Sequence, residues 1–325
     1  ERKLHKALKD KVALFCNISP GAVIESRDVS TIYEVPILME KEELDRVVLE
    51  KLDIPSKKEL DMDDWHNFVN VIKKPERETN IGLVGKYIEL KDSYKSIAES
   101  FIHAGARNKC RVNLKWIHSE EINEANISET LKNLDGILVA PGFGKRGIEG
   151  KILTAKYARE NRIPFLGICL GMQCAVIEFA RNVLGYQDAN STEVAPDTKY
   201  PVIDLMEDQK NIVEMGGTMR LGSYPCKLDP DSKTFAVYGK EMIAERHRHR
   251  FEFNNKYLAD FEKMGMHAAG KNPNTDLVEV MEIVDHPWYV GVQYHPEYKS
   301  TVLNPHPLFV SFVKAAIECK MNVVA

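Results

Sequence analysis

Long hydrophobic runs are missing from this chain of 325 residues. No apolar stretch approaches the roughly 18 residues that a membrane-spanning helix needs, and no secretory signal pattern is visible at the N-terminus. The chain also lacks a strong charge of either sign: its formal net charge is −4, so no global basic field favours nucleic acid. We therefore expect neither a membrane nor a nucleic acid among its partners.

Cysteine is scarce and scattered along the chain. The six cysteines include no Cys-x-x-Cys pair, so neither a zinc site nor a disulfide framework is expected, and we predict no metal site in this chain. This cysteine usage suits a reducing compartment, which predicts a cytoplasmic protein. A phosphate-binding loop is missing too, because no Gly-x-x-x-x-Gly-Lys-[Ser/Thr] pattern or related lysine loop precedes residue 11.

Length and composition predict two domains, or one large domain with an additional piece. The chain is 44% hydrophobic, which is enough to bury a substantial core. Residues 12–16 resemble a short buried strand within a first segment, 1–55. The stretch 56–79, which ends in a polar, proline-bearing part, is interpreted as a linker with a short helix over 65–72. The first residue is Glu1 rather than methionine, so we expect the chain to have been cut from something longer.

From residue 80 onward, strand and helix patterns alternate. This alternation predicts an α/β fold in which helices cover both faces of a parallel sheet, with ligands at the carboxyl ends of the strands. Strands are predicted over 80–84, 111–117, 136–139, 163–168, 277–284 and 289–294, and helices over 94–106, 150–161 and 306–317.

The most informative motif is Gly167-Ile168-Cys169-Leu170-Gly171, which ends an apolar run and precedes a helical pattern. A strand, a sharp turn and a helix place Cys169 on a nucleophile elbow, where the glycines allow a strained turn and the helix N-terminus favours a thiolate. A lone cysteine in an apolar run is more often a small core residue, and we interpret Cys174, inside the predicted helix, in that way.

A second motif, His295-Pro296-Glu297, follows the last predicted strand. In a strand, residues two apart face the same side, so Glu297 can orient the imidazole of His295. A lone histidine beside proline is usually structural, but its combination with the Gly-x-Cys-x-Gly spacing favours a functional role. Cysteine, histidine and carboxylate are the groups needed for acyl transfer through a thioester.

Both motifs resemble those of the class I glutamine amidotransferases, which use a Cys-His-Glu triad. Further stretches narrow the resemblance to the CTP synthase family, and it covers essentially the whole chain. It implies a flavodoxin-like glutaminase domain over 80–325, preceded by a partial, P-loop-like α/β synthetase segment over 1–55. The stretches that carry it are 11–17, 28–36, 189–193 (Ala-Asn-Ser-Thr-Glu), 216–222 (Gly-Gly-Thr-Met-Arg-Leu-Gly) and 245–250 (Glu-Arg-His-Arg-His-Arg).

The resemblance assigns roles to residues around Cys169. Backbone N–H groups of Gly142 and Leu170 hold the oxyanion, and Leu170 directly follows the nucleophile, where an elbow places one donor. Residues that bind glutamine or gate the ammonia exit are, by resemblance, Gln173, Glu193, Arg250 and Phe143. The stretch 246–250 also fits a charged surface strand with its arginines on one face, or a nucleic-acid patch, although aromatic residues do not interleave with it.

Two positions depart from the family pattern. The family usually has Pro-Gly-Gly-Phe-Gly where this chain has Ala140-Pro141-Gly142-Phe143-Gly144. Proline lacks an N–H and fixes φ near −65°, so Pro141 leaves the Gly142 donor in place but stiffens the turn and restricts Ala140. We expect a functional oxyanion hole whose position is shifted. Tyr298 stands where the family commonly has Phe, which we expect to be benign.

The parent reaction implied by the resemblance converts UTP, ATP and glutamine to CTP, with Mg²⁺ at the ATP and GTP as allosteric activator through a lid at 216–222. The glutaminase step itself needs no cofactor, and we expect this chain to perform only that step. By resemblance, Lys11 contacts the pyrimidine nucleotide and Asp28 and Val29 lie beside the adenine; otherwise they are a strand-flanking lysine and a turn.

Other interpretations remain open at this point. The chain could be the glutaminase of another class I amidotransferase, a γ-glutamyl hydrolase, or a non-catalytic assembly fragment. The family forms homotetramers, but the tetramer contacts lie largely in the synthetase region that precedes this chain, so a tetramer is not predicted here. The match over 11–36 argues against the first two alternatives, and the complete triad argues against the third.

Overall fold

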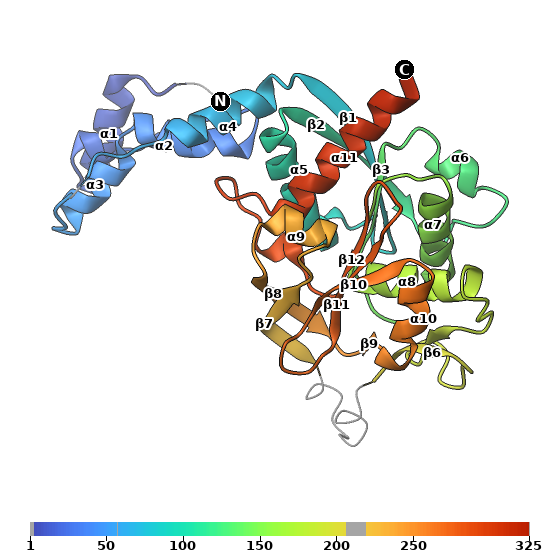
Figure 1. Ribbon diagram of the computed structural model, residues 1–325. Coiled ribbons are helices and arrows are strands. Elements are labelled where there is room, and N and C mark those ends of the chain that lie inside the picture. Colours follow the sequence, from blue (N-terminus) through green and yellow to red (C-terminus); the bar gives the residue numbers. More distant parts are fainter. Residues whose placement is uncertain (1–2, 57, 206–218, 325) are drawn as a thin grey trace. The chain divides into compact units, whose positions relative to one another are not determined.

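The structure is a computed structural model that describes residues 3–56, 58–205 and 219–324. The chain divides into two compact units, Glu1–Lys74 (unit 1) and Pro75–Ala325 (unit 2), and Figure 1 draws both. Within the described residues, no helix is both long enough and apolar enough to cross a membrane.

Unit 1 is built from short helices. An aromatic contact holds two of its segments together: the rings of Tyr33 and Phe68 meet edge to face at 4.9 Å, and the indole N–H of Trp65 donates to the Tyr33 carbonyl at 2.8 Å. The elements are α1 (Lys6–Cys16), η1 (Pro20–Ala22), η2 (Ile32–Glu34), α2 (Val35–Lys41), α3 (Leu44–Lys51) and α4 (Asp63–Lys73). Helix α4 lies within the stretch 56–79 that the sequence predicted as a linker.

The strand predicted over 12–16 is wrong, because these residues form the second half of α1. Five apolar residues in a row are too few for periodicity to distinguish a strand from a helix. The ends of α1 carry local signals instead: the His5 ring accepts from the backbone N–H of Leu8 at 3.2 Å, and Asn17 closes the helix in the left-handed conformation.

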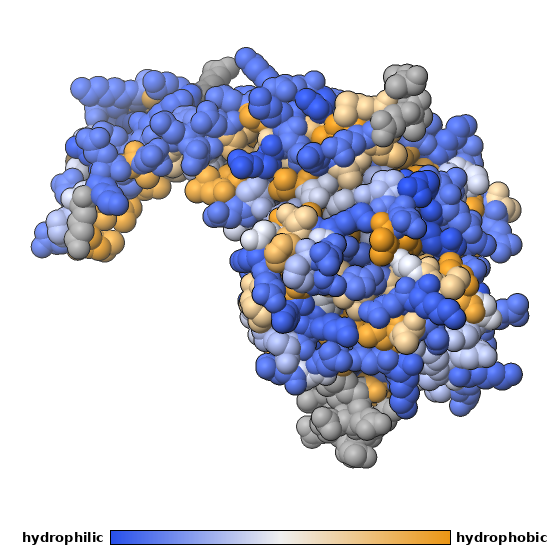
Figure 2. Space-filling model, viewed as in Figure 1, coloured by the Kyte–Doolittle hydropathy of each residue, from blue (hydrophilic) through white to orange (hydrophobic). Residues whose placement is uncertain are grey.

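Unit 1 buries little of its apolar surface. In α1 only Ala13 is buried, whereas Leu14 and Phe15 are each 79% exposed. Figure 2 shows hydrophobic side chains gathered along one side of this unit. The described residues of unit 1 contain no strand, so the N-terminal segment is helical in this structure.

Unit 2 is an α/β domain around a nine-stranded sheet. Its strands, in spatial order, are β2 (Cys110–His118), β1 (Arg77–Gly85), β3 (Gly136–Val139), β4 (Phe165–Ile168), β12 (Tyr289–Val292), β11 (Val278–Ile283), β10 (Met266–Lys271), β7 (Arg220–Leu228) and β8 (Met242–His249). Neighbours from β2 to β12 pair in parallel, as the sequence predicted. From β12 to β8 the pairs are antiparallel.

Helices cover both faces of the central part of this sheet, so the side chains of β3, β4 and β12 are buried on both sides. Along β3, Ile137 and Val139 belong to the core formed with α7 (Ile148–Glu160), α8 (Leu170–Asn182) and α10 (Leu258–Lys263). Leu138 belongs to the opposite core, formed with α5 (Lys95–Arg107) and α11 (Pro307–Val324). Two buried faces explain the continuous apolar runs of the central strands.

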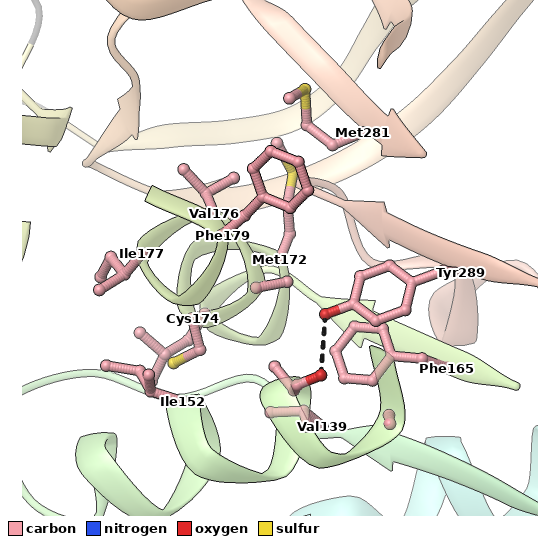
Figure 3. Packing of buried hydrophobic residues seen from close by; sticks show 14 of the residues in the cluster. Val139, Ile152, Phe165, Met172, Cys174, Val176, Ile177, Phe179, Met281 and Tyr289 are labelled. Atoms are coloured by element: carbon pink, nitrogen blue, oxygen red, sulfur yellow. Dashed lines mark hydrogen bonds between the residues drawn. The ribbon is translucent and has the colours of Figure 1, made fainter. Parts of the chain in front are cut away.

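The core beneath α8 is shown in Figure 3. Phe165 of β4 and Tyr289 of β12 stack with ring centroids 4.3 Å apart, and the Tyr289 hydroxyl donates to the Ala155 carbonyl of α7 at 3.2 Å. Cys174 is fully buried in this core, which confirms its interpretation as a packing residue. The remaining elements are α6 (Ile127–Leu131), α9 (Lys233–Tyr238), η3 (Lys91–Tyr94), η6 (Asn255–Tyr257), η7 (Pro296–Tyr298) and a small sheet of β5 (Asn190–Ser191), β6 (Pro201–Asp204) and β9 (Glu252–Phe253).

Candidate active site

Cys169 occupies the junction between β4 and α8. Its backbone has φ 53° and ψ −104°, a conformation that non-glycine residues rarely adopt. The N–H of Cys169 donates to the Val292 carbonyl at 2.7 Å and thereby ties the turn to β12. Such strain at a single residue between strand and helix is the geometry of a nucleophile elbow, which the sequence predicted.

The two flanking glycines, Gly167 and Gly171, are needed because the backbone around them packs closely, and not because they adopt a positive φ. A methyl group on Gly171 would lie 2.1 Å from the Val139 carbonyl oxygen, and one on Gly167 would lie 2.7 Å from the backbone of Gly171. Neither glycine has a positive φ, so the strained residue is Cys169 itself. The glycines let the first turn of α8 lie directly against β3 and β4, and in this way they allow the strained turn at Cys169.

His295 and Glu297 are joined by a hydrogen bond of 2.7 Å between Nδ1 and Oε1. Both residues are buried, and the Tyr298 ring stacks on the imidazole at a centroid distance of 5.0 Å. The strand argument for this pair is wrong, because His295 precedes the 3₁₀ turn η7 and the turn brings the carboxylate back to the imidazole. The backbone N–H of His295 donates to the Arg246 carbonyl at 2.8 Å, which anchors the turn to β8.

The imidazole of His295 faces two groups that favour its charged form. Burial opposes the charge, but the neighbouring Cys169 and Glu297 outweigh burial and raise the pKa of His295 to about 11. The Nε2 atom is buried and has no hydrogen-bond partner among the described residues, so it can exchange a proton with the Cys169 thiol or with the substrate. This electrostatic arrangement is that of an activated cysteine paired with a base.

The turn after β3 carries Gly142, one of the two residues predicted to donate to the oxyanion, and we call this turn the oxyanion loop. The N–H of Ala140 donates to the Val84 carbonyl of β1 at 2.9 Å, which fixes where the loop starts. A methyl group on Gly142 would lie 3.5 Å from a side-chain carbon of Leu170, so the two predicted donors come from adjoining segments. Leu170 is the first residue of α8, and N–H groups at that position have no partner within the helix.

The predicted residues of the glutamine pocket lie on four segments of unit 2. Glu193 accepts the backbone N–H of Gly144 at 2.8 Å, which brings it to the oxyanion loop, where Phe143 is 45% exposed. Gln173 is buried on α8 and donates to the Phe251 carbonyl at 3.0 Å. Arg250 directly precedes Phe251 and follows β8. The fold therefore links Gln173 to the segment that carries Arg250.

One residue of this site was not predicted from the sequence. Gln293, at the end of β12, directs its amide nitrogen to the Cys169 sulfur at 3.6 Å and accepts from Gln173 at 3.2 Å. It stands two residues before His295, and this spacing was the only signal available in the sequence. Its two contacts connect the cysteine to the first turn of α8 and to β12.

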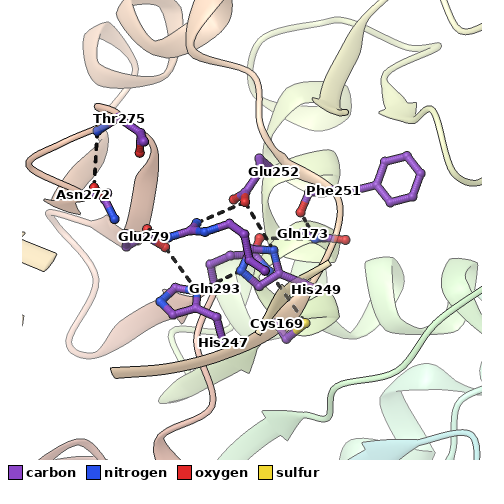
Figure 4. Close-up of polar contacts among 11 residues, drawn as sticks. Cys169, Gln173, His247, His249, Phe251, Glu252, Asn272, Thr275, Glu279 and Gln293 are labelled. Carbon is purple, nitrogen blue, oxygen red and sulfur yellow. Dashed lines mark hydrogen bonds and ion pairs between the residues drawn. The ribbon is translucent and has the colours of Figure 1, made fainter. Parts of the chain in front are cut away.

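A buried polar cluster, also not predicted, lies beside Gln293 in Figure 4. Arg220 of β7 donates to Glu252 at 3.0 Å and to Glu279 at 2.8 Å. His247 and His249 contact each other at 2.8 Å. Burial lowers the pKa of His247 to about 3, with the Arg220 charge adding to the effect, and burial raises the pKa of Glu252 to about 8.

The alternation over β8 explains part of this cluster. Its histidines are buried while Arg246 and Arg248 are on the exposed face, which confirms the predicted shared face for these two arginines. Arg250 follows the strand and is half-buried, so the prediction does not extend to it. The sequence did not show that the histidine face packs on charged residues, because Arg220 and Glu279 come from separate strands. Residues 216–218 of the predicted lid lie outside the described residues.

The predicted nucleotide residues lie in unit 1. Lys11 is exposed on α1, Asp28 is exposed between η1 and η2, and Val29 next to it is half-buried. No group of three or more metal-ligating side chains gathers within residues 3–56, 58–205 and 219–324.

Comparison with known proteins shows to which family this chain belongs. A model described as glutamine amidotransferase class-I matches residues 89–315, and a model described as CTP synthase N-terminus matches 1–54. The solved glutaminase domain of Trypanosoma brucei CTPS, with bound acivicin, is 36% identical with a TM-score of 0.70, covering 74% of this chain and 94% of that one. The chain belongs to the CTP synthase family.

Curated CTP synthases match almost the whole chain. The CTP synthase of Cytophaga hutchinsonii is 61% identical over 97% of the chain, and that of Flavobacterium johnsoniae is 58% identical over 98%. The chain spans 59% of the length of each of these relatives. The two family models match different units of the chain. The match to glutamine amidotransferase class-I lies in unit 2, and the match to the CTP synthase N-terminus lies in unit 1.

Proposed function

We propose that unit 2 hydrolyses glutamine through a thioester on Cys169, and that the chain is the glutaminase part of a CTP synthase together with the end of its synthetase domain. The observation that carries the proposal is the 2.7 Å contact between His295 and Glu297 beside a cysteine held on a strained elbow. The similarity to CTP synthases along nearly the whole chain supports the assignment.

The proposed chemistry proceeds in two halves. His295 takes the proton of the Cys169 thiol, and the sulfur attacks the side-chain amide carbon of glutamine. The N–H groups of Gly142 and Leu170 hold the resulting oxyanion. His295 then gives the proton to the amide nitrogen, the C–N bond breaks, and ammonia leaves a thioester on the sulfur.

Water completes the cycle. His295 removes a proton from the water as it attacks the thioester carbon, the C–S bond breaks, and glutamate leaves with the thiol restored. Glu297 holds the Nδ1 proton throughout, so that Nε2 faces the reacting atoms. In this scheme Glu297 is a positioning residue, and Cys169 and His295 exchange protons and bonds with the substrate.

The same proposal assigns the recognition of glutamine. Glu193 pairs with the α-amine, Arg250 pairs bidentately with the α-carboxylate, and Gln173 assists. The contact between Glu193 and the N–H of Gly144 supports a pocket next to the oxyanion loop. The exposed ring of Phe143 is then placed to gate the exit of ammonia.

For the complete enzyme we propose that the released ammonia aminates UTP to CTP with ATP and Mg²⁺, that GTP activates the glutaminase, and that CTP is a further ligand. Lys11, Asp28 and Val29 are the nucleotide contacts in this proposal. In this proposal Mg²⁺ and the ATP phosphates bind to regions of the relatives that this chain does not span. We further propose a cytoplasmic enzyme that assembles as a homotetramer only in its longer form.

Glutamate release tests the proposal. The purified chain is given glutamine with and without GTP, beside Cys169→Ala. Release that the substitution abolishes supports the glutaminase, and stimulation by GTP supports the activator. No release by a chain whose circular dichroism shows it folded would favour a non-catalytic assembly fragment.

A further inference from the structure

The lysine of α7 that reaches the oxyanion loop has no role in the steps above. Lys151 is fully buried in the first turn of α7, and its Nζ donates to the Ala140 carbonyl at 2.7 Å. A buried ammonium is costly, and a helix N-terminus is an unfavourable place for a positive charge. Such a residue calls for an explanation other than packing.

We propose that Lys151 is a positioning residue for glutamine hydrolysis: its hydrogen bond to Ala140 fixes the direction of the Gly142 N–H in the oxyanion hole. The inference rests on the proposed glutaminase function and assigns it one more residue. The argument depends on the short stretch of backbone between the two groups.

Only one soft torsion separates the held carbonyl from the donor. The Ala140–Pro141 and Pro141–Gly142 peptide groups are planar, and the ring of Pro141 fixes its φ. Once the Ala140 carbonyl is held, ψ of Pro141 alone decides where the Gly142 N–H points. The hydrogen bond from Lys151 therefore controls the donor more directly here than it would if a glycine preceded Gly142.

A second lysine confines that remaining torsion from the other end of the loop. Lys86, which is 5% exposed, donates from Nζ to the Phe143 carbonyl. A methyl group on Gly142 would lie 3.4 Å from Cε of Lys86 and 3.7 Å from Nζ of Lys151. Both lysines thus hold carbonyls on either side of Gly142 and line the space next to it.

The position of Lys151 is itself rigid. A methyl group on Gly150, the preceding residue, would lie 1.8 Å from the Ser119 carbonyl oxygen, so the first turn of α7 packs directly on backbone. Burial lowers the pKa of Lys151 to about 8, with Cys174 and Cys169 raising it and Lys86 lowering it, so the ammonium stays mostly protonated at pH 7. A rigid, charged donor suits the task of orienting a loop.

The test compares Lys151→Met with Lys156→Met, the same change at a half-buried lysine of the same helix. Four assays are run on each full chain: steady-state kinetics of glutamine hydrolysis, which give kcat and KM, the rate at which iodoacetamide alkylates Cys169, hydrogen exchange of the peptide that contains Ala140–Gly142, and thermal unfolding. Alkylation is a displacement at a saturated carbon and forms no oxyanion, so it reports the thiol without the oxyanion hole.

We expect Lys151→Met to lower kcat by about 10- to 100-fold with KM changed by less than about threefold, as for loss or misplacement of a supporting contact. The rate of Cys169 alkylation stays within about threefold of wild type, and hydrogen exchange of the loop peptide becomes faster. Thermal stability is unchanged or higher because a buried charge is removed. Lys156→Met behaves as wild type in every assay.

Other outcomes overturn the proposal. An unchanged kcat in a folded Lys151→Met chain, or equal losses of hydrolysis and alkylation, would show that Lys151 does not act through the oxyanion loop. If that variant does not fold, Lys151→Leu, which likewise removes the donor, is judged by the same criteria. If wild type itself releases no glutamate, the proposed function has failed, and unaltered loop exchange in the variant would separately overturn the role of Lys151.

Discussion

At the scale of single residues, the site is organised around one strained cysteine. Cys169 adopts a positive φ at the end of β4, and the surrounding backbone holds it there through the hydrogen bond to Val292 and the tight packing of Gly171 on Val139. The strain lifts the sulfur to the carboxyl edge of the sheet, next to His295. The geometry explains why the motif needs glycines two residues before and after the nucleophile.

The carboxylate of Glu297 should matter through orientation. Replacing it in Glu297→Gln keeps the shape but weakens the hold on the Nδ1 proton, so we expect kcat for glutamine hydrolysis to fall by about 10- to 100-fold with little change in KM. Steady-state kinetics beside the exposed control Glu124→Gln measures this. A kcat within twofold of wild type would show that His295 is oriented by other contacts.

Gly171 tests the packing beneath the nucleophile. In Gly171→Ala the new methyl group meets the Val139 carbonyl, and backbone cannot move aside as a flexible side chain can. We expect a loss of about 1–3 kcal/mol in the free energy of unfolding, as for overpacking elsewhere, together with a displaced Cys169. Urea unfolding compares it with Gly21→Ala, where nothing lies within 4 Å of the added methyl group. Equal midpoints for the two variants would contradict the packing argument.

At the scale of elements, sequence patterns predicted the parts that obey simple rules. Strand β3, with its four buried apolar residues, was predicted with the observed bounds, because a short apolar run between polar turns fits a strand covered on both faces. Helix α8 was predicted from the helical pattern after the motif, and the role of Cys169 at its start from the spacing of two glycines. These features are local, so nearby residues are sufficient to indicate them.

Features that depend on distant residues were missed. The first part of α1 is rich in helix-forming residues. Residues 12–16 are all apolar, however, so they show no hydrophobic periodicity that could distinguish a helix from a strand. The sequence of β10 does not alternate cleanly between apolar and polar residues, so the strand was not predicted. Its pairing with β7 and β11 is known only from the structure. The contacts of Arg220 with Glu252 and Glu279 join three strands, and no spacing along the chain predicts them.

His286 should make unit 2 sensitive to acid. Its Nδ1 accepts from the Trp288 N–H, its Nε2 donates to the Ala158 carbonyl of α7, and burial lowers its pKa from 6.5 to about 4. As the pH falls, the unfolded chain takes up the proton first, so stability is complete above about pH 6.5 and is lost toward pH 4.

Urea midpoints at pH 7.5, 6 and 5 measure this loss. In His286→Gln, which keeps a donor for Ala158 but does not titrate, we expect a smaller fall of the urea midpoint between pH 7.5 and 5. Buried His247 and His249, whose pKa values burial also lowers, account for the fall that remains. An identical pH dependence in both proteins would exclude His286 as a contributor.

At the scale of the whole molecule, the two units differ in how much of their apolar surface they bury. Unit 2 has two large buried cores, whereas unit 1 leaves residues such as Leu14 and Phe15 exposed. Every residue proposed for glutamine hydrolysis lies in unit 2. This division agrees with the matches of the two family models to separate parts of the chain.

Removing residues 1–74 should therefore spare the glutaminase. We expect the shortened chain to unfold cooperatively, with a melting temperature within a few degrees of that of unit 2 in the full chain, and to keep kcat within about threefold, because no element of the site is lost. Calorimetry and glutamate release test both statements. A shortened chain that folds but has lost its activity would show that unit 1 contributes to the site.

The central claim is that Cys169 carries the glutamyl group during turnover. The most direct measurement is mass spectrometry of the chain quenched in acid during glutamine hydrolysis, followed by peptide mapping. The account predicts a glutamyl thioester on the peptide that contains Cys169, absent from Cys169→Ala and absent without glutamine. Glutamate release that continues in Cys169→Ala, with no adduct on that peptide, would contradict it.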